Sequence, residues 1–237
     1  MPELPEVETV RRQLEPLLAG RRIVDAEAHP SPKFAPAVRA VAHRVGGVRR
    51  RGKYLLFDLL DGGDTPRELV VHLGMTGGLH VVDAPSPDPY RRARWELDDG
   101  RNLVFRDVRR FGRIAVVPAG DHRSLPTLHD LGPEPFDPVL DAGGFHARLA
   151  GSRRRVKTHL LSQRPIAGVG NIYADEALRG RSGMTTGANV DDVHLEGQFR
   201  LDCYGRAGSP CARCRTPLTS RPLDQRTATW CPSCQAR

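Results

Sequence analysis

The chain has 237 residues, with 36 Lys or Arg against 28 Asp or Glu, so its formal net charge is +8 and its pI about 9.8. This length suits one large domain or two ordinary ones, and the charge favours a polyanionic partner. No apolar run is long enough to span a bilayer, and the first twenty residues carry four Glu. We therefore expect no signal peptide, no membrane contact, and a cytosolic protein.

The N-terminus places Pro2 and Glu3 directly after the initiator Met, which is normally removed before a residue as small as Pro2. The mature chain would then open with a secondary amine, and its adduct with an electrophilic carbon is a permanently charged iminium. Glu3 is placed to move protons for that amine. The same segment also suits a helix start, with Pro5 in the first turn. The expected buried face of this helix consists of Val7, Val10, Leu14 and Leu17.

Short β-strand patterns separated by Asp-Gly turns follow the first helix. Strands are expected at 22–27, 53–60, 69–73, 79–83, 95–97, 103–105 and 114–117. Such a series is typical of an antiparallel sandwich or barrel. A Pro-rich linker at 131–138 precedes helical patterns at about 139–150, 153–163 and 171–178.

The C-terminal region carries a four-cysteine pattern, Cys211-x2-Cys214 followed after sixteen residues by Cys231-x2-Cys234. This spacing is typical of a zinc ribbon, in which four thiolates hold one structural ion and leave no position for water. Unrelated thiols are the alternative. Cys203 lies outside the pattern, and we expect it to be a small, partly buried side chain rather than a ligand.

Lysine is rare, since only Lys33, Lys53 and Lys157 occur among the 36 cationic residues. A lysine that persists in such an Arg-rich chain marks a position where the amine itself is needed, because only an amine releases its proton or fits as a compact point charge. Chance survival of three lysines is the alternative. Lys53 and Lys157 both fall within the motifs described next.

Several segments together resemble the formamidopyrimidine-DNA glycosylase family, bacterial enzymes that excise oxidised purines. They are the opening MPELPEVETVRRQLEPLLAG, the internal motifs RRGKYLL, HLGMTG, DVRRFG, RRRVKT and GVGNIYA, and the zinc ribbon. Relatives called endonuclease VIII usually have Gly at the position of Leu4, so the chain is more similar to the first group. Val108 stands where the family usually has Pro, a departure expected to be mild.

The resemblance implies an α+β fold with an N-terminal helix and antiparallel β-sandwich in residues 1–130. It further implies a shortened helix-two-turn-helix-like domain with its linker in residues 131–204, and a zinc finger in residues 205–237. The implied catalytic residues are Pro2, Glu3, Lys53 and Arg226. The implied DNA-binding residues are Met75, Arg109, Phe111, Arg153, Lys157 and Asn171. The implied ligands of one structural Zn²⁺ are Cys211, Cys214, Cys231 and Cys234.

Simpler roles stay open for several of these residues. Met75 and Phe111 suit insertion into the gap left by an extruded base, with Arg109 pairing to the orphaned base, but Met and Phe also fill cores. Gly168 and Gly170 permit close approach to phosphate, whereas Asn171 is also an ordinary helix cap. An Arg-rich strand edge would explain the residues before Lys53.

The resemblance breaks after Asn171, because only 39 residues separate it from Cys211. The family has a longer stretch here, which includes helices and a loop that closes over the extruded base. An internal deletion is the simplest explanation, with 184–186, Phe199 and 204–206 as remnants of its far side. The surface that supports Asn171 would then be incomplete.

We therefore predict a monomeric, bifunctional glycosylase and abasic-site lyase that acts on oxidised purines such as 8-oxoguanine and formamidopyrimidines in double-stranded DNA. The amine of Pro2 would form a Schiff base, followed by β,δ-elimination. The first alternative is an impaired paralogue that binds damaged or abasic DNA without efficient excision. The second is an unrelated zinc-ribbon module, which the intact Pro2, Glu3 and Lys53 disfavour.

Overall fold

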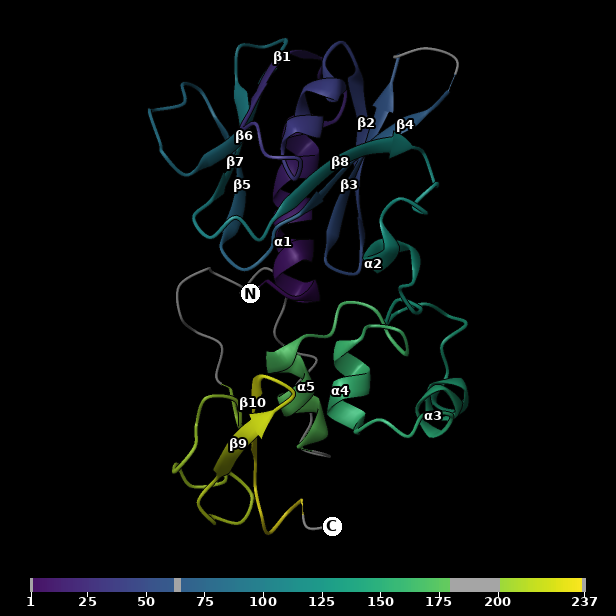
Figure 1. Cartoon of the computed structure of the whole chain (residues 1–237), viewed down its shortest axis with the longest axis vertical. Helices are drawn as coiled ribbons and strands as arrows, with labels where there is room; N and C mark the ends of the chain where they lie inside the picture. The colour runs from purple at the N-terminus through teal and green to yellow at the C-terminus, as the bar shows by residue number, and fades with distance from the viewer. Residues whose placement is uncertain (1, 62–64, 180–200, 236–237) are drawn as a thin grey trace. The chain divides into compact units, whose positions relative to one another are not determined.

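The computed structural model describes residues 2–61, 65–179 and 201–235, and the chain divides into two compact units, 1–130 and 131–237 (Figure 1). Unit 1 contains α1 (Leu4–Leu18) and two four-stranded antiparallel sheets, with orders β1-β6-β7-β5 and β2-β3-β4-β8. The strands are β1 (Ile23–Ala28), β2 (Arg44–Arg51), β3 (Tyr54–Leu60), β4 (Arg67–His72), β5 (Gly77–Val82), β6 (Arg91–Leu97), β7 (Asn102–Asp107) and β8 (Arg113–Pro118). The expected α+β fold with an antiparallel sandwich is confirmed.

The N-terminal helix packs against both sheets, since α1 contacts β2 and β3 of one and β5 of the other. Its buried apolar residues are Val7, Leu14 and Leu18, while Leu17 is exposed, so the expectation for Leu17 was wrong. Steps of seven and four residues return to one helix face, whereas Leu17 lies about 100° away from Leu18. Packing against both sheets therefore fixes the position of α1.

Aromatic side chains fill the core between the two sheets. Phe57 comes from β3, Trp95 from β6 and Phe105 from β7, and all three are fully buried. The Trp95 indole N–H donates to the Ala37 carbonyl at 3.0 Å. Ala37 belongs to a 3₁₀ helix, η1 (Ala35–Ala40), which the sequence did not predict and which this bond ties to the core.

Strand β2 was not predicted because its sequence lacks regular alternation. It contains four Arg, buries Val45 and Val48, and shifts register between these two residues. An edge strand needs only one partner, and cationic residues are common there because they discourage pairing with other chains. Pairing with β3 thus determines the strand, and the link between β2 and β3 is the two-residue turn Gly52-Lys53.

The described residues of unit 2 form the helices α3 (Ala142–Ala150), α4 (Val156–Leu161) and α5 (Asn171–Leu178), and the hairpin of β9 (Thr219–Leu223) and β10 (Arg226–Trp230). Helix α5 packs against α4 on one side and β10 on another. A short helix in unit 1, α2 (Pro126–His129), was not predicted. The predicted boundary between 204 and 205 lies inside unit 2 and stays a prediction. Within the described ranges, every helix is too short or too polar to cross a bilayer.

Candidate functional site

The start of α1 holds Pro2 and Glu3 in a defined geometry. Glu3 is the N-cap and is buried, and it forms a capping box with Glu6. The Glu3 backbone N–H donates to Glu6 Oε2 at 2.8 Å, and the Glu3 carboxylate faces the backbone N–H of Glu6. A capping box satisfies backbone donors at both ends of the first turn. The Glu3 carboxylate is therefore fixed next to the expected Pro2 amine.

Lys53 occupies the second position of the turn between β2 and β3, after Gly52, whose φ of +55° is a conformation that favours glycine. Its side chain is buried, although a lysine is usually exposed. Burial of His72, then the positive charges of Lys53 and Arg113, lower the pKa of that imidazole to about 4. A neutral imidazole therefore lies within the field of Lys53 at neutral pH.

His72 is a candidate that the sequence did not single out, although it begins the HLGMTG motif. Its ring lies 4.7 Å from the Tyr54 ring, centroid to centroid, and Tyr54 directly follows Lys53. Tyr54 also shares a 2.5 Å hydrogen bond with Thr127. A single His in a Gly-rich motif was the sequence feature that could have indicated this residue. Its proximity to Lys53, however, depends on the pairing of β3 with β4.

Two neighbouring turns present Met75 and Phe111 to solvent, with exposed fractions of 41% and 48%. Core filling, the simpler role left open for both residues, is therefore wrong. The Arg109 guanidinium lies over the Phe111 ring, with Cζ 4.9 Å from its centroid. The turns approach closely at Gly74, where a Cβ would lie 2.5 Å from the Gly112 nitrogen. Exposed Met and Phe beside Arg are the groups expected of a base-stack wedge.

The buried Asp107 carboxylate fixes these two turns to each other. Asp107 Oδ1 accepts the Thr76 hydroxyl at 2.6 Å, and Oδ2 accepts the Gly112 N–H at 2.7 Å. The Thr76 hydroxyl oxygen in turn accepts the Arg109 N–H at 3.1 Å. Met75 and Phe111 therefore lie on two turns that the hydrogen bonds of Asp107 hold together.

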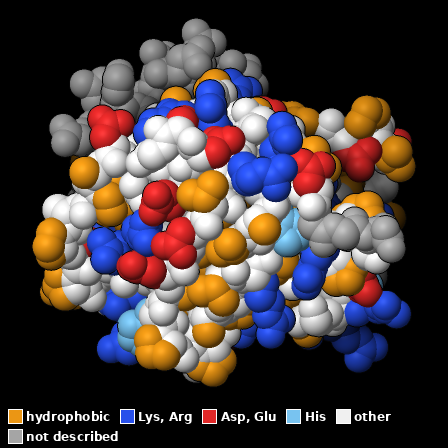
Figure 2. All heavy atoms as spheres, turned by 90° about the horizontal axis from the view of Figure 1, so that it is seen from above, with side chains coloured by type: hydrophobic (Ala, Val, Ile, Leu, Met, Phe, Trp, Pro, Cys, Tyr) orange, Lys and Arg blue, Asp and Glu red, His pale blue; other side chains and the backbone are white. Residues whose placement is uncertain are grey.

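Three Arg side chains on or next to these turns have no carboxylate partner among the described residues. Many Arg side chains of unit 1 pair with carboxylates, as Arg49 does with Asp58 at 2.6 Å, and Figure 2 shows a face where basic and acidic side chains lie together. Among the residues that the structure describes, Arg109, Arg110 and Arg113 form no ion pair with a carboxylate. Unpaired guanidinium groups are suited to phosphate oxygens.

Asn171 and Lys157 lie together in unit 2. Asn171 Nδ2 donates to the Thr227 carbonyl at 3.2 Å, and Lys157 Nζ donates to the same carbonyl at 2.8 Å. Gly170, not Asn171, is the N-cap of α5, so the capping alternative for Asn171 is wrong. The side chain of Asn171 points instead to the zinc-ribbon hairpin, where it contacts Thr227 of β10.

Arg226 is exposed at the first position of β10. The preceding turn residues, Asp224 and Gln225, both have positive φ, as a tight hairpin turn requires. Asp224 Oδ2 accepts the Thr158 hydroxyl, which ties the turn to α4. Arg153 is also exposed, in the segment before α4. Neither Arg forms an ion pair within the described part of the chain, so both are available to an anionic ligand.

The four predicted cysteines converge, with sulfur atoms within 4.8 Å of one another. Cys214 Sγ and Cys231 Sγ are 3.5 Å apart. This distance is close to the separation of about 3.8 Å between sulfur atoms in a tetrahedral zinc thiolate site. The group therefore fits one Zn²⁺. Cys203 is fully rather than partly buried, and its thiol donates to the Thr229 carbonyl at 2.9 Å. Burial raises the pKa of Cys203 to about 12, in line with a structural thiol outside the metal site.

Residues 202–204, which lead into the zinc ribbon, bind to α5. Glu176 accepts three consecutive backbone N–H groups, those of Asp202, Cys203 and Tyr204, at 3.1, 2.9 and 2.8 Å. Arg179 forms an ion pair with Asp202. These bonds fix the entry to the zinc ribbon on the helix that carries Asn171. The proposed remnants at 184–186 and Phe199 lie outside the described residues.

Comparison with known proteins gives matches along nearly the whole chain. The model of the formamidopyrimidine-DNA glycosylase N-terminal domain matches residues 1–114, and that of the H2TH domain of this enzyme matches residues 131–185. A zinc finger found in FPG and IleRS matches residues 208–237.

Individual relatives match over similar lengths. Formamidopyrimidine-DNA glycosylase of Deinococcus radiodurans is 40% identical over 278 residues, covering 99% of this chain and 97% of the relative. The crystal structure of MutM (Fpg) from Thermus thermophilus superposes with a TM-score of 0.84 at 38% identity, covering 100% and 99% of the two chains. Lactococcus lactis Fpg in complex with a FAPY-dG containing DNA superposes with a TM-score of 0.79 at 29% identity, covering 99% of this chain and 100% of that chain.

The lengths of these matches bear on the shortened stretch. The match to the Deinococcus radiodurans enzyme extends over 278 positions, 41 more than the 237 residues of this chain. At least 41 positions of the match therefore have no counterpart here, although both ends of the chain are covered. This difference agrees with the expected internal deletion, whose location after Asn171 stays a prediction.

Proposed function

Because this chain belongs to the formamidopyrimidine-DNA glycosylase family, we propose that it is a base-excision-repair enzyme with two activities. The first removes oxidised purines from DNA, and the second cuts the strand at the resulting abasic site. The observation that carries the proposal is the full-length match to a formamidopyrimidine-DNA glycosylase. The L. lactis relative, whose structure contains FAPY-dG DNA, supports the substrate class.

Duplex DNA is the proposed partner, bound by a monomer chiefly through its phosphates. The unpaired Arg110 and Arg113 would neutralise phosphates near Met75 and Phe111, with release of counterions. Met75 and Phe111 would occupy the gap left by the extruded nucleotide, and Arg109 would donate to the orphaned base. In unit 2 the proposed DNA-binding residues are Arg153, Lys157 and Asn171.

The proposed chemistry begins at Pro2. Its ring nitrogen attacks C1′ of the extruded sugar as the bond from C1′ to the base breaks, and the base leaves with the electron pair and gains a proton. Glu3 assists by protonating the sugar ring oxygen, which opens the ring and gives the iminium. The iminium acidifies the C2′ proton, and loss of that proton breaks the C3′–O bond. A second elimination then breaks the C5′–O bond.

Lys53 and Arg226 are proposed to support these eliminations. Lys53 would bind the phosphate beside the lesion and assist proton transfer, and Arg226 would hold a phosphate from the tip of the hairpin. Zinc would be held by Cys211, Cys214 and the second cysteine pair, and would keep that hairpin folded.

Borohydride trapping on an abasic duplex tests the proposal. Protein with a free Pro2 nitrogen should give a covalent cross-link, because borohydride reduces the iminium to a stable amine. Glu3→Gln should suppress excision of the oxidised base more than cutting of a preformed abasic site, since the abasic sugar has no base to expel. Processed protein that binds abasic DNA and gives no cross-link would contradict a lyase.

A binding-only paralogue is the second candidate function. It is favoured by one observation, the 41 or more positions of the match that this chain lacks. If the lost positions include groups that hold the extruded base, binding would persist without turnover. The absence of a cross-link, together with salt-sensitive binding to abasic DNA, would favour this candidate.

A further inference from the structure

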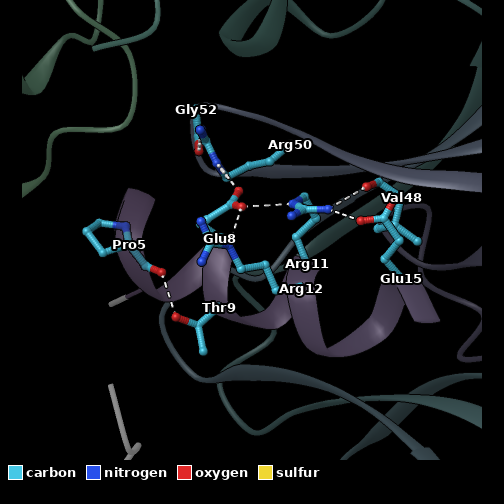
Figure 3. A network of polar contacts seen from close by, with 9 residues as sticks. All are labelled: Pro5, Glu8, Thr9, Arg11, Arg12, Glu15, Val48, Arg50 and Gly52. Carbon is cyan, nitrogen blue, oxygen red and sulfur yellow. Dashed lines mark hydrogen bonds and ion pairs between the residues drawn. The ribbon is translucent and has the colours of Figure 1, made fainter. Parts of the chain in front are cut away.

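Glu8, in the second turn of α1, accepts hydrogen bonds from three Arg side chains (Figure 3). Its Oε1 accepts Arg11 Nε at 3.0 Å and Arg12 Nε at 3.1 Å, while its Oε2 accepts Arg50 Nε at 3.0 Å. Arg11 and Arg12 belong to α1 itself, whereas Arg50 belongs to β2. The bond to Arg50 is thus the one of the three that joins separate elements.

Arg50 makes a second bond, from Nη1 to the Gly52 carbonyl at 3.0 Å. This carbonyl belongs to the peptide group that links Gly52 to Lys53, so the bond fixes the orientation of the backbone that enters Lys53. Because the Lys53 side chain is buried, the position of its amine follows closely from that backbone. The two nitrogens of one guanidinium therefore connect α1 to the turn that carries Lys53.

The other end of this connection is the start of the chain. Glu8 lies on the helix whose N-cap is Glu3, directly after Pro2. Burial of Glu8 opposes its ionisation, yet hydrogen bonds from Arg11, Arg12 and Arg50 hold the pKa of this carboxyl below its ordinary value. Glu8 therefore stays charged at neutral pH and retains Arg50 as a partner.

We propose that Arg50, anchored by Glu8, is a positioning residue that holds Lys53 at a fixed place relative to Pro2 and Glu3. The inference rests on the proposed function, in which the amine of Pro2 and the amine of Lys53 act on one nucleotide. Two groups that act together must be held to within a fraction of an ångström, and misplacement by about 1 Å can cost about 100-fold in rate. An Arg suits this task because its separated donors reach two acceptors at once.

The lysine content of the chain allows a direct test on the free protein. With isotopically labelled lysine, the protein should give three lysine side-chain NMR signals, one each for Lys33, Lys53 and Lys157. Arg50→Gln should shift the signal of Lys53 and leave the other two in place. The matched control is Arg12→Gln, which removes another Glu8 partner from an exposed position and should shift none of the three. An unmoved Lys53 signal in Arg50→Gln would overturn the proposal.

A double-mutant cycle tests whether Arg50 acts through Lys53. On a preformed abasic duplex, Arg50→Gln should slow strand cutting about tenfold or more, while Arg12→Gln cuts like the unmodified protein. In a Lys53→Ala background, Arg50→Gln should cost less than about twofold further, because residues that act through one another are not additive. Full additivity would show that Arg50 acts independently of Lys53 and would overturn the proposal.

A second variant and the lysine signals distinguish failure of this proposal from a folding defect and from the loss of lyase activity. If Arg50→Gln does not fold, Glu8→Gln removes the anchor while keeping the shape of its side chain, and the same shift of Lys53 is expected. If the unmodified protein does not cut abasic DNA at all, the proposed lyase activity fails. The lysine signals still decide whether Arg50 positions Lys53.

Discussion

Lys157 Nζ lies 2.6 Å from Asp175 Oδ1, and the two side chains are only 5% and 3% exposed. The same Nζ donates to the Thr227 carbonyl, and Asp175 Oδ2 accepts the Thr229 N–H at 3.1 Å. This ion pair and its two hydrogen bonds therefore join α4, α5 and β10. The contact of Lys157 with a DNA phosphate stays a prediction. The geometry adds a structural task for this lysine, to hold Asn171 beside the hairpin that carries Arg226.

Asp175→Asn should destabilise unit 2, because it leaves the Lys157 cation buried without a counter-charge. Breaking a buried pair in this way typically costs about 3–5 kcal/mol. Urea unfolding followed by probes in each unit should show the loss in unit 2. The control Asp121→Asn removes the partner of Arg123 in an exposed pair and should leave the urea midpoint nearly unchanged, because solvent screens such a pair. Equal stability of the two variants would show that the buried pair contributes little.

The sequence predicted local features well and non-local ones poorly. The cysteine spacing is enough to predict the metal group, since each CxxC pair is local and the two pairs need only a short hairpin between them. The partnership of Lys157 with Asp175 was not predictable, because it depends on how α4 packs against α5. For the same reason the sequence singled out Lys157 by the scarcity of lysine and by resemblance, without its partner.

Helix capping and edge strands show the same limit. Asn171 resembles a capping residue, yet it is the first residue of α5, and Gly170 before it is the N-cap. The Asn171 side-chain amide donates instead to the Thr227 carbonyl on β10. Strand β2 has no period-2 pattern, and its pairing with β3 defines it. Arg50 lies on β2 and Lys53 lies in the turn after it. The contacts that connect Arg50 to Lys53 could therefore not be found without predicting β2.

His72 should make stability depend on pH in a defined direction. Its pKa of about 4 in the folded chain lies below the ordinary value of 6.5, so between these values the unfolded chain binds more protons. Stability should therefore fall as pH falls from about 6.5 towards 4. His72→Gln should lose less stability over this interval in denaturant titrations at stepped pH. An unchanged pH dependence would mean that His72 titrates normally.

Phe111→Ala should impair activity without impairing the fold. Phe111 is 48% exposed, so its removal uncovers little core, and the melting temperature should change by less than about 2 °C. A residue that fills the gap in the base stack offsets part of the unstacking cost, a few kcal/mol per step. Excision should fall at least about tenfold. The control Phe136→Ala removes another exposed Phe, in the linker, and should leave excision unchanged.

Removal of zinc should act on the ribbon first. Metal analysis should find one zinc per chain, and chelation should unfold the residues after about 205, because binding of the ion supplies much of the folding energy of such ribbons. DNA binding should weaken as Arg226 and its hairpin lose their structure. Cys203→Ser should keep the full zinc content, since Cys203 bonds to Thr229 and lies outside the four-cysteine group. Zinc-free protein purified without chelator would contradict this prediction.

The shortened stretch should separate the two activities. Discrimination between bases depends on contacts to the extruded base, whereas cutting of an abasic site needs only the sugar and the Pro2 amine. Pro2, Glu3 and Lys53 all lie in unit 1, and Glu176 fixes the ribbon on α5 despite the missing positions. We therefore expect measurable cutting of preformed abasic sites and much weaker excision of 8-oxoguanine. Binding to undamaged duplex should remain sensitive to salt. Single-turnover kinetics on matched abasic and 8-oxoguanine duplexes provide the measurement, and efficient, selective excision would show that the missing positions are not needed to read the base.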